Sequence, residues 1–104
     1  MRFGLAVAGL LVAAGLASSP ASAYLVKANV QCPDVLKEDA NPTFRLQNNW
    51  WVLGYISALN YANDTNRGEG VSSEDVYSLL LDFCEQNPEA DIDEAGQYLY
   101  NIMR

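Results

Sequence analysis

The stretch TFRLQNNWWVLGYISALNYA, residues 43–62, is the longest helical signal in the chain and decides the expected fold. Placed at intervals of about 100°, its apolar side chains cover one broad face and much of the opposite side. A helix that is apolar nearly all round is buried on most of its sides. We therefore expect a central helix with Thr43 as its N-cap, in which Gly54, Ser57 and Ala58 let a neighbour approach closely.

A short helix is expected before this central one. Pro33 directly follows Cys32, and proline suits the first turn of a helix because its missing N–H needs no partner there. Asp34-Val35-Leu36 continues this helix for one or two turns, and we expect it to end before Asn41-Pro42.

Two further helices are expected after the central one. Ser72 with Asp75, and Asp91 with Glu94, have the spacing of helix-start caps, and Pro88 ends the first of these two helices. Apolar residues recur at helical spacing in both, and no strand pattern competes. The sequence therefore predicts an all-α fold: a small bundle of three main helices plus one short N-terminal helix.

Residues 1–23 have the pattern of a secretory signal. Arg2 supplies the positive start, residues 4–17 are uncharged and apolar, and Ala21-Ser22-Ala23 is a cleavage site of small residues. The apolar run is shorter than the roughly 20 residues that span a bilayer. We expect a cleaved signal peptide, and a mature domain of residues 24–104 in the bacterial periplasm without a membrane anchor.

Charge and composition limit the function of this domain. Five basic residues against thirteen acidic ones give it a formal charge of −8, which disfavours nucleic acid and anionic lipid as partners. The chain has no histidine, and so lacks the commonest general base and the commonest metal ligand. We expect no enzymatic activity, no metal and no cofactor, and proteins as partners.

Cys32 and Cys84 are the only cysteines, and an exported chain reaches an oxidising compartment. A disulfide between them closes a loop of about 53 residues, which stabilises a domain by on the order of 4 kcal/mol. A reactive thiol pair or two metal ligands are the alternatives. The spacing is not CxxC and no histidine completes a zinc site, so we expect a structural disulfide.

Aromatic side chains are concentrated in the central helix. Trp50, Trp51, Tyr55 and Tyr61 either fill the core or form a hydrophobic surface that binds a partner or a second copy. Trp50 and Trp51 point about 100° apart on a helix, so we expect one of them to face something other than the core.

Two polar segments suggest weaker candidates. Asp91, Asp93 and Glu94 form either a cation or acid–base site or a helix start that favours negative charge. The loop 64–70 faintly resembles a calcium loop, but Glu69 occupies the position of the required glycine and Arg67 adds a cation. We expect capping at the first segment and no calcium at the second.

Taken together, four segments resemble the HdeA/HdeB family of acid-stress chaperones: CPDVL at 32–36, WVLGYISALN at 51–60, FCEQNP at 83–88, and the last helix with Glu94-Ala95 and Leu99. The resemblance covers nearly all of the mature chain. It implies an all-helical periplasmic domain with one disulfide between the equivalent cysteines. It also implies a dimer near neutral pH that opens in strong acid and holds unfolding clients.

A second resemblance competes with the first. The Gly-Tyr-Ile segment at 54–56, followed by a late helix near Asn87-Pro88, is similar to small exported immunity proteins of the Tai type. Those proteins bind a toxic effector, and they usually carry further cysteines near their ends. A structural or assembly accessory of the periplasm is the remaining alternative.

The expected acid response depends on carboxylates that stabilise the fold only while they are ionised. Such a group has a lowered pKa in the folded protein, and its stabilisation is lost as the pH falls through that value. The capping residues Asp75, Asp91 and Glu94 are the candidates. Neutralising every carboxylate would also change the charge from side chains from −8 to +5.

Overall fold

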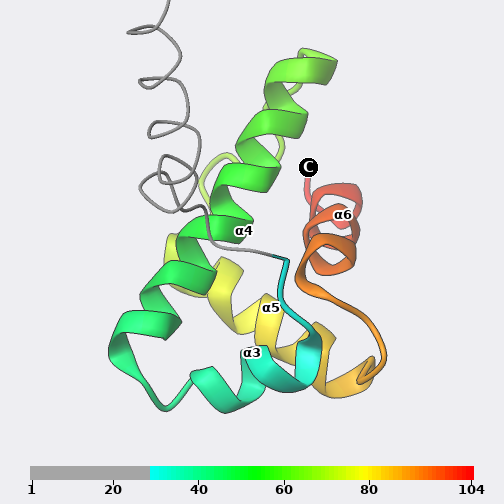
Figure 1. The fold of residues 1–104 in the computed structure, drawn as a ribbon. Helices are drawn as coiled ribbons and strands as arrows, with labels where there is room; N and C mark the ends of the chain where they lie inside the picture. Colours follow the sequence, from blue (N-terminus) through cyan, green and yellow to red (C-terminus); the bar gives the residue numbers. More distant parts are fainter. Residues whose placement is uncertain (1–28) are drawn as a thin grey trace, which may run out of the picture.

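The computed structural model describes residues 29–104, which form four α-helices and no strand (Figure 1). The expected signal peptide and residues 24–28 lie outside this range. The all-helical prediction with one disulfide is confirmed. The helices are α3 (Cys32–Glu38), α4 (Pro42–Asn63), α5 (Ser73–Gln86) and α6 (Ile92–Ile102).

Helix α4 begins earlier than predicted. Its N-cap is Asn41, not Thr43, and the Asn41 Oδ1 atom accepts hydrogen bonds from the backbone N–H groups of Thr43 (2.9 Å) and Phe44 (3.2 Å). Pro42 takes the first helical position, where its missing N–H costs nothing. Asparagine is also a better N-cap than threonine, so the start moves upstream of the proline.

The starts of α5 and α6 agree with the sequence prediction. The Ser72 Oγ atom accepts from the Asp75 N–H at 3.0 Å, which caps α5. At α6 both bonds of a capping box form: the Glu94 N–H donates to Asp91, and the Asp91 N–H donates to Glu94, each at 3.1 Å. The first backbone N–H groups of a helix have no partner within the helix, so each one that is hydrogen-bonded in this way makes the helix end less prone to fray.

The expectation that α4 is buried on most of its sides is wrong. Only Asn48, Val52 and Ile56 are buried, and they form one stripe along the helix. With 22 residues α4 is three times as long as α3, and α5 and α6 have 14 and 11 residues. Three shorter helices cannot surround a rod of this length, so α4 packs on one side and extends past its neighbours (Figure 1).

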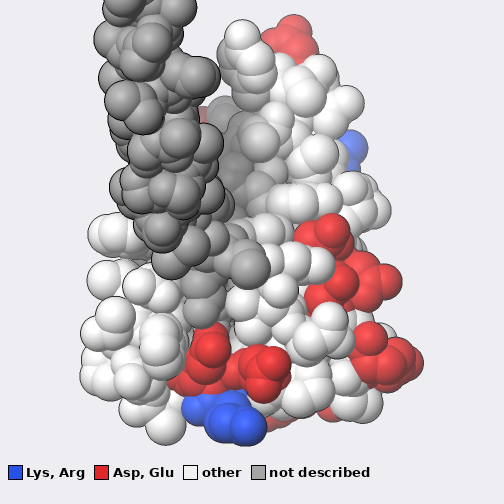
Figure 2. Space-filling view, viewed as in Figure 1, with Lys and Arg blue, Asp and Glu red and all other residues white. Residues whose placement is uncertain are grey.

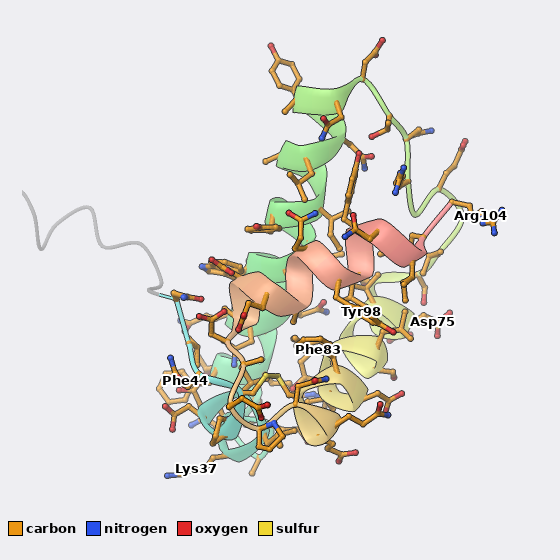
Figure 3. The ribbon with its side chains drawn as sticks, turned by 90° about the vertical axis from the view of Figure 1, so that its right-hand side faces the viewer. Lys37, Phe44, Asp75, Phe83, Tyr98 and Arg104 are labelled. Carbon is orange, nitrogen blue, oxygen red and sulfur yellow. A yellow bond between two sulfur atoms is a disulfide. The ribbon has the colours of Figure 1, made fainter. Side chains whose placement is uncertain are left out.

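The core lies where the other three helices meet that stripe. Its fully buried side chains include Val35 of α3, Leu80 of α5 and Leu99 of α6. Phe83 and Tyr98 close the space between α5 and α6, with ring centroids 5.2 Å apart (Figure 3). Each helix therefore contributes one apolar stripe to a single small core.

Close helix approach depends on a glycine that differs from the one expected. Nothing lies within 4 Å of the position that a Cβ atom at Gly54 would occupy, and Ser57 and Ala58 are exposed. At Gly96 of α6 the same position lies 2.7 Å from the Tyr55 ring. The missing side chain of Gly96 is thus what lets α6 sit against α4.

A disulfide joins the start of α3 to α5. Cys32 and Cys84 are fully buried, with Cα atoms 4.9 Å apart. Backbone hydrogen bonds on either side hold the chain before α3 against the start of α6: the Cys32 N–H donates to the Ala90 carbonyl (2.9 Å) and the Ile92 N–H donates to the Val30 carbonyl (2.8 Å). Three chain segments are therefore tied together at this end of the bundle.

Removing the disulfide should strongly destabilise the fold. The double variant C32A/C84A is expected to lose on the order of 4 kcal/mol of unfolding free energy, because its unfolded chain regains the freedom of the opened loop. Urea unfolding followed by circular dichroism measures the loss. Wild-type protein unfolded in the presence of a reductant should match the variant, and an unchanged urea midpoint in both would contradict the structural role.

Substituting the two helical glycines should give effects of opposite sign. G96A is expected to destabilise by about 1–3 kcal/mol, because the new methyl group overlaps the Tyr55 ring. G54A is its matched control, with open space around it, and should stabilise by roughly 0.5–1 kcal/mol through helix propensity. Thermal unfolding of both variants is the measurement, and equal shifts would show that Gly96 is not a contact residue.

Candidate protein-binding surface on helix α4

The side of α4 that points away from the core is apolar and uncharged. Trp50 is 65% exposed and Tyr61 is 91% exposed. Gly54, Ser57 and Ala58 lie between them on the same side at helical spacing, and all three are exposed. We call these five residues the outer face of α4.

Single exposed hydrophobic residues are common, and what distinguishes Trp50 and Tyr61 is that both lie on the same uncharged side of one helix. The only charged residue of α4 is Arg45, which points away from the outer face by helical geometry. Elsewhere acidic side chains gather over α3 and beside the start of α6 (Figure 2). The outer face therefore differs in character from these acidic patches.

The four aromatic residues singled out in the sequence divide into two pairs. Trp50 and Tyr61 belong to the outer face. Trp51 and Tyr55 are half-buried, and their rings stack with centroids 5.5 Å apart. Trp51 packs against the core, and Tyr55 lies against Gly96. The structure thus gives the two tryptophans different environments, with Trp50 turned towards solvent.

The pKa values of Asp91 and Asp93 are shifted in opposite directions. The pKa of Asp91 is lowered, chiefly because its carboxylate accepts from the Glu94 N–H and, in addition, from Asn29 Nδ2 (3.0 Å). The pKa of Asp93 is raised by partial burial and by the negative charge of Asp91. Asp91 therefore stabilises the fold when ionised, whereas ionised Asp93 opposes it.

Asn29 links this helix start to the chain before α3. Its Nδ2 donates to Asp91, and its Oδ1 accepts from the Asp93 backbone N–H at 3.3 Å. Asp75 lies at the start of a different helix, α5, where its backbone N–H donates to the Ser72 Oγ atom. The three candidate pH-responsive carboxylates are thus not one cluster, and only two of them are brought together.

The loop 64–70 is held by polar contacts that the sequence did not indicate. The Asn60 Oδ1 atom accepts from the Arg67 N–H and from the Thr65 hydroxyl, each at 2.8 Å. The Arg67 guanidinium lies over the Tyr100 ring, 4.6 Å from its centroid, and donates to the Tyr100 carbonyl at 3.2 Å. Arg67 therefore fastens the loop to α6.

A second polar cluster joins the turn before α4 to α5. The Tyr77 hydroxyl donates to Asp39 Oδ1 (2.6 Å), and Arg45 Nε lies 3.4 Å from the same oxygen. The Arg45 guanidinium also covers the Tyr77 ring at 5.0 Å. Burial, followed by the bond to Asp39, raises the pKa of Tyr77. These residues come from three separate segments, so no local motif pointed to them.

Neither a group of metal-ligand side chains nor a membrane-spanning helix is present within residues 29–104. Within residues 29–104, no three or more His, Cys, Asp and Glu side chains are grouped to hold a metal ion. In the same range, no helix is both long enough and apolar enough to cross a bilayer.

Comparison with known proteins gives no match: no family model, no curated protein and no solved structure is significantly similar to this chain. The resemblance to the HdeA/HdeB family therefore stays a prediction from the sequence.

The substitutions D91N and D93N should separate the two acidic residues. The Asp91 contribution is fully present above the unfolded value near 3.8 and is lost as the pH falls through its lowered folded pKa. The Asp93 penalty is present above its raised folded pKa and vanishes as the pH falls. At neutral pH, D91N should destabilise by up to about 1 kcal/mol, and D93N should stabilise.

Urea unfolding at pH 7, 4 and 3 measures both effects. Asparagine is itself a good N-cap, so D91N tests the charge and not the cap geometry. Compared with wild type, D91N should lose less stability on acidification. The assignment would be overturned if both variants shifted stability in the same direction at neutral pH.

Proposed function

We propose that this chain is an exported, non-enzymatic protein that binds unfolding proteins in acid through the outer face of α4. The observation that carries the proposal is the exposure of Trp50 and Tyr61 on an uncharged helix face of an otherwise acidic domain. Tryptophan and tyrosine supply much of the binding energy at protein interfaces. An apolar face without charges also fits the sequence-independent capture of unfolded segments.

The acid dependence rests on contacts that need ionised carboxylates. Protonation of Asp91 weakens its bonds to Asn29 and to the Glu94 N–H. Protonation of Asp39 removes its ion pair with Arg45. Both changes loosen connections between helices, and the loss of negative charge lets the domain approach clients that are cationic in acid. The raised pKa of Asp93 works against this opening, so it should be partial.

The disulfide gives the proposed opening a limit. Because Cys32 and Cys84 are covalently joined and fully buried, α3 and α5 stay linked when the polar contacts weaken. Loosening then affects α4 and α6 more than the α3–α5 end. At neutral pH the same outer face is available to a second copy, so a homodimer is part of the proposal.

An immunity protein that binds one secreted effector is the second candidate. The observation in its favour is that Trp50 and Tyr61 are already exposed in the folded domain, so no acid-induced opening is needed to present them. This candidate requires a tight, stoichiometric partner at neutral pH. A periplasmic accessory protein would need neither an acid response nor an effector.

Client aggregation in acid tests the proposal. An acid-labile enzyme such as alcohol dehydrogenase is brought to about pH 2.5, where nearly all carboxylates are protonated, and light scattering is followed with and without the protein. Wild type should suppress scattering, and W50A/Y61A should lose most of the suppression. I102A is the control, because Ile102 is an exposed apolar residue of α6 outside the outer face.

Absence of both suppression and apolar-dye binding in acid would exclude the chaperone. Equal suppression by W50A/Y61A and wild type would exclude the outer face as its binding surface. Capture of one toxic exported enzyme at neutral pH, lost in W50A/Y61A, would favour the immunity protein instead.

A further inference from the structure

A groove with a volume of about 700 Å³ separates the first turns of α4 from the first half of α5. One wall carries Leu46 and Asn49 of α4. The other carries Glu74, Ser78 and Leu81 of α5, which recur at the spacing of one helix face. Neither the outer face of α4 nor the acidic helix start at Asp91 forms any part of it.

One end of the groove is already organised. Asp39, Arg45 and Tyr77 line it, and the bonds among them occupy the Arg45 charge and the Tyr77 hydroxyl. Tyr77 is only 4% exposed. Because the cation of the groove is held by Asp39 and by an aromatic ring, it is not free to neutralise a second carboxylate.

That second carboxylate is Glu74. It lines the groove, and its carboxylate makes no hydrogen bond or ion pair with another residue of the range 29–104. The groove therefore holds two carboxylates and one guanidinium, a surplus of one negative charge. Apolar surface lies beside this charge, since Leu46 is 48% exposed and Leu81 is half-buried. A matching ligand needs a positive charge and apolar carbon within one short segment.

Asn49 adds an unmet hydrogen-bond acceptor to the same wall. Its Oδ1 is covered by surrounding atoms and accepts no hydrogen bond from any residue of the described range. A buried acceptor without a donor is unfavourable. An N–H donor seated in the groove would offer the missing bond once the amide turns towards it.

We propose that this groove binds a lysine or arginine side chain of a partner protein, together with a neighbouring apolar residue of that partner. The charged end pairs with Glu74, and the methylene groups lie along Leu46 and Leu81, as long basic side chains do on apolar surfaces. The groove is much larger than one side chain, which favours a peptide segment over a free cation. The acidic surplus of the whole domain also steers a basic segment towards it.

The inference goes beyond the proposed acid function. The groove is complete in the folded domain, and its use requires an ionised Glu74, whereas client capture is expected in acid. A failure of one proposal therefore leaves the other standing.

Two capped tripeptides provide the probe: acetyl-Leu-Lys-Leu-amide and its neutral analogue acetyl-Leu-Gln-Leu-amide. Each is titrated into the folded protein at pH 7, and amide chemical shifts are followed by NMR. The lysine peptide should shift the signals of Leu46, Ser78 and Leu81 in a saturable way and bind about threefold or more tightly than the glutamine peptide. Higher salt should reduce that difference.

Variants of α5 then locate the site. E74Q should remove the preference for lysine, and S78W should block binding by filling the groove. E85Q is the matched control, because Glu85 lies on the same helix outside the groove. Since Glu74, Ser78 and Glu85 are all exposed, these variants should fold, and their circular dichroism spectra check this.

Four results would overturn the proposal. One is equal affinity for the two peptides, and another is an unchanged lysine preference in E74Q. A third is a set of shifts confined to Trp50 and Tyr61, which would assign binding to the outer face. The fourth is equally tight binding of spermidine, which would make the groove a site for free cations.

Discussion

The covalent link between Cys32 and Cys84 is the constraint on which the rest of the structure depends. A domain of this size buries so little apolar surface that it is only marginally stable without such a link. The bond fixes α3 against α5, and the adjacent backbone bonds bring the chain before α3 onto the start of α6. Val35, Leu80 and Ile92 can then share one fully buried core. Helix α4, which carries no cysteine, is joined to this unit by packing and polar contacts alone.

This dependence explains why both candidate surfaces involve α4, the outer face on its own and the groove together with α5. Helices α3, α5 and α6 together form one apolar surface, and α4 packs on this surface through Val52 and Ile56. The remaining sides of a helix that is longer than its neighbours must stay uncovered. The outer face is the side of α4 opposite this contact, and the groove lies between α4 and α5 beside the turn that connects α3 to α4.

Features set by neighbours in the sequence could be predicted, and features set by distant contacts could not. The capping box of Asp91 and Glu94 needs residues three positions apart, and both of its bonds form. The disulfide followed from the presence of only two cysteines, together with an N-terminal segment that has the pattern of a secretory signal. By contrast, the degree to which α4 is covered depends on the lengths of three other helices.

The residues of the candidate sites also divide into those that the sequence indicated and those that it did not. Trp50 and Tyr61 were marked by composition, and helical geometry indicated that the two tryptophans point apart, but not which one is exposed. The cluster of Asp39, Arg45 and Tyr77 joins residues up to 38 positions apart, so nothing local announces it. Asn60 looked like an ordinary helix residue, although its amide organises the following loop.

The two ends of α4 differ in how they are attached, and this sets a gradient of local stability along the molecule. Beyond Ile56 the helix has no fully buried side chain, and no basic residue in its last turn offsets the helix dipole. That end is held by Leu59 at the edge of the core, by the Asn60 amide and by Arg67 reaching α6. Polar contacts near solvent open more readily than a packed core, so we expect backbone amides around Tyr61 to exchange with water before those beside the disulfide. The outer face therefore includes both parts of the helix. Trp50 lies on the part that packs against the core, and Tyr61 lies on the less stable part, whose conformation can adjust to a bound partner.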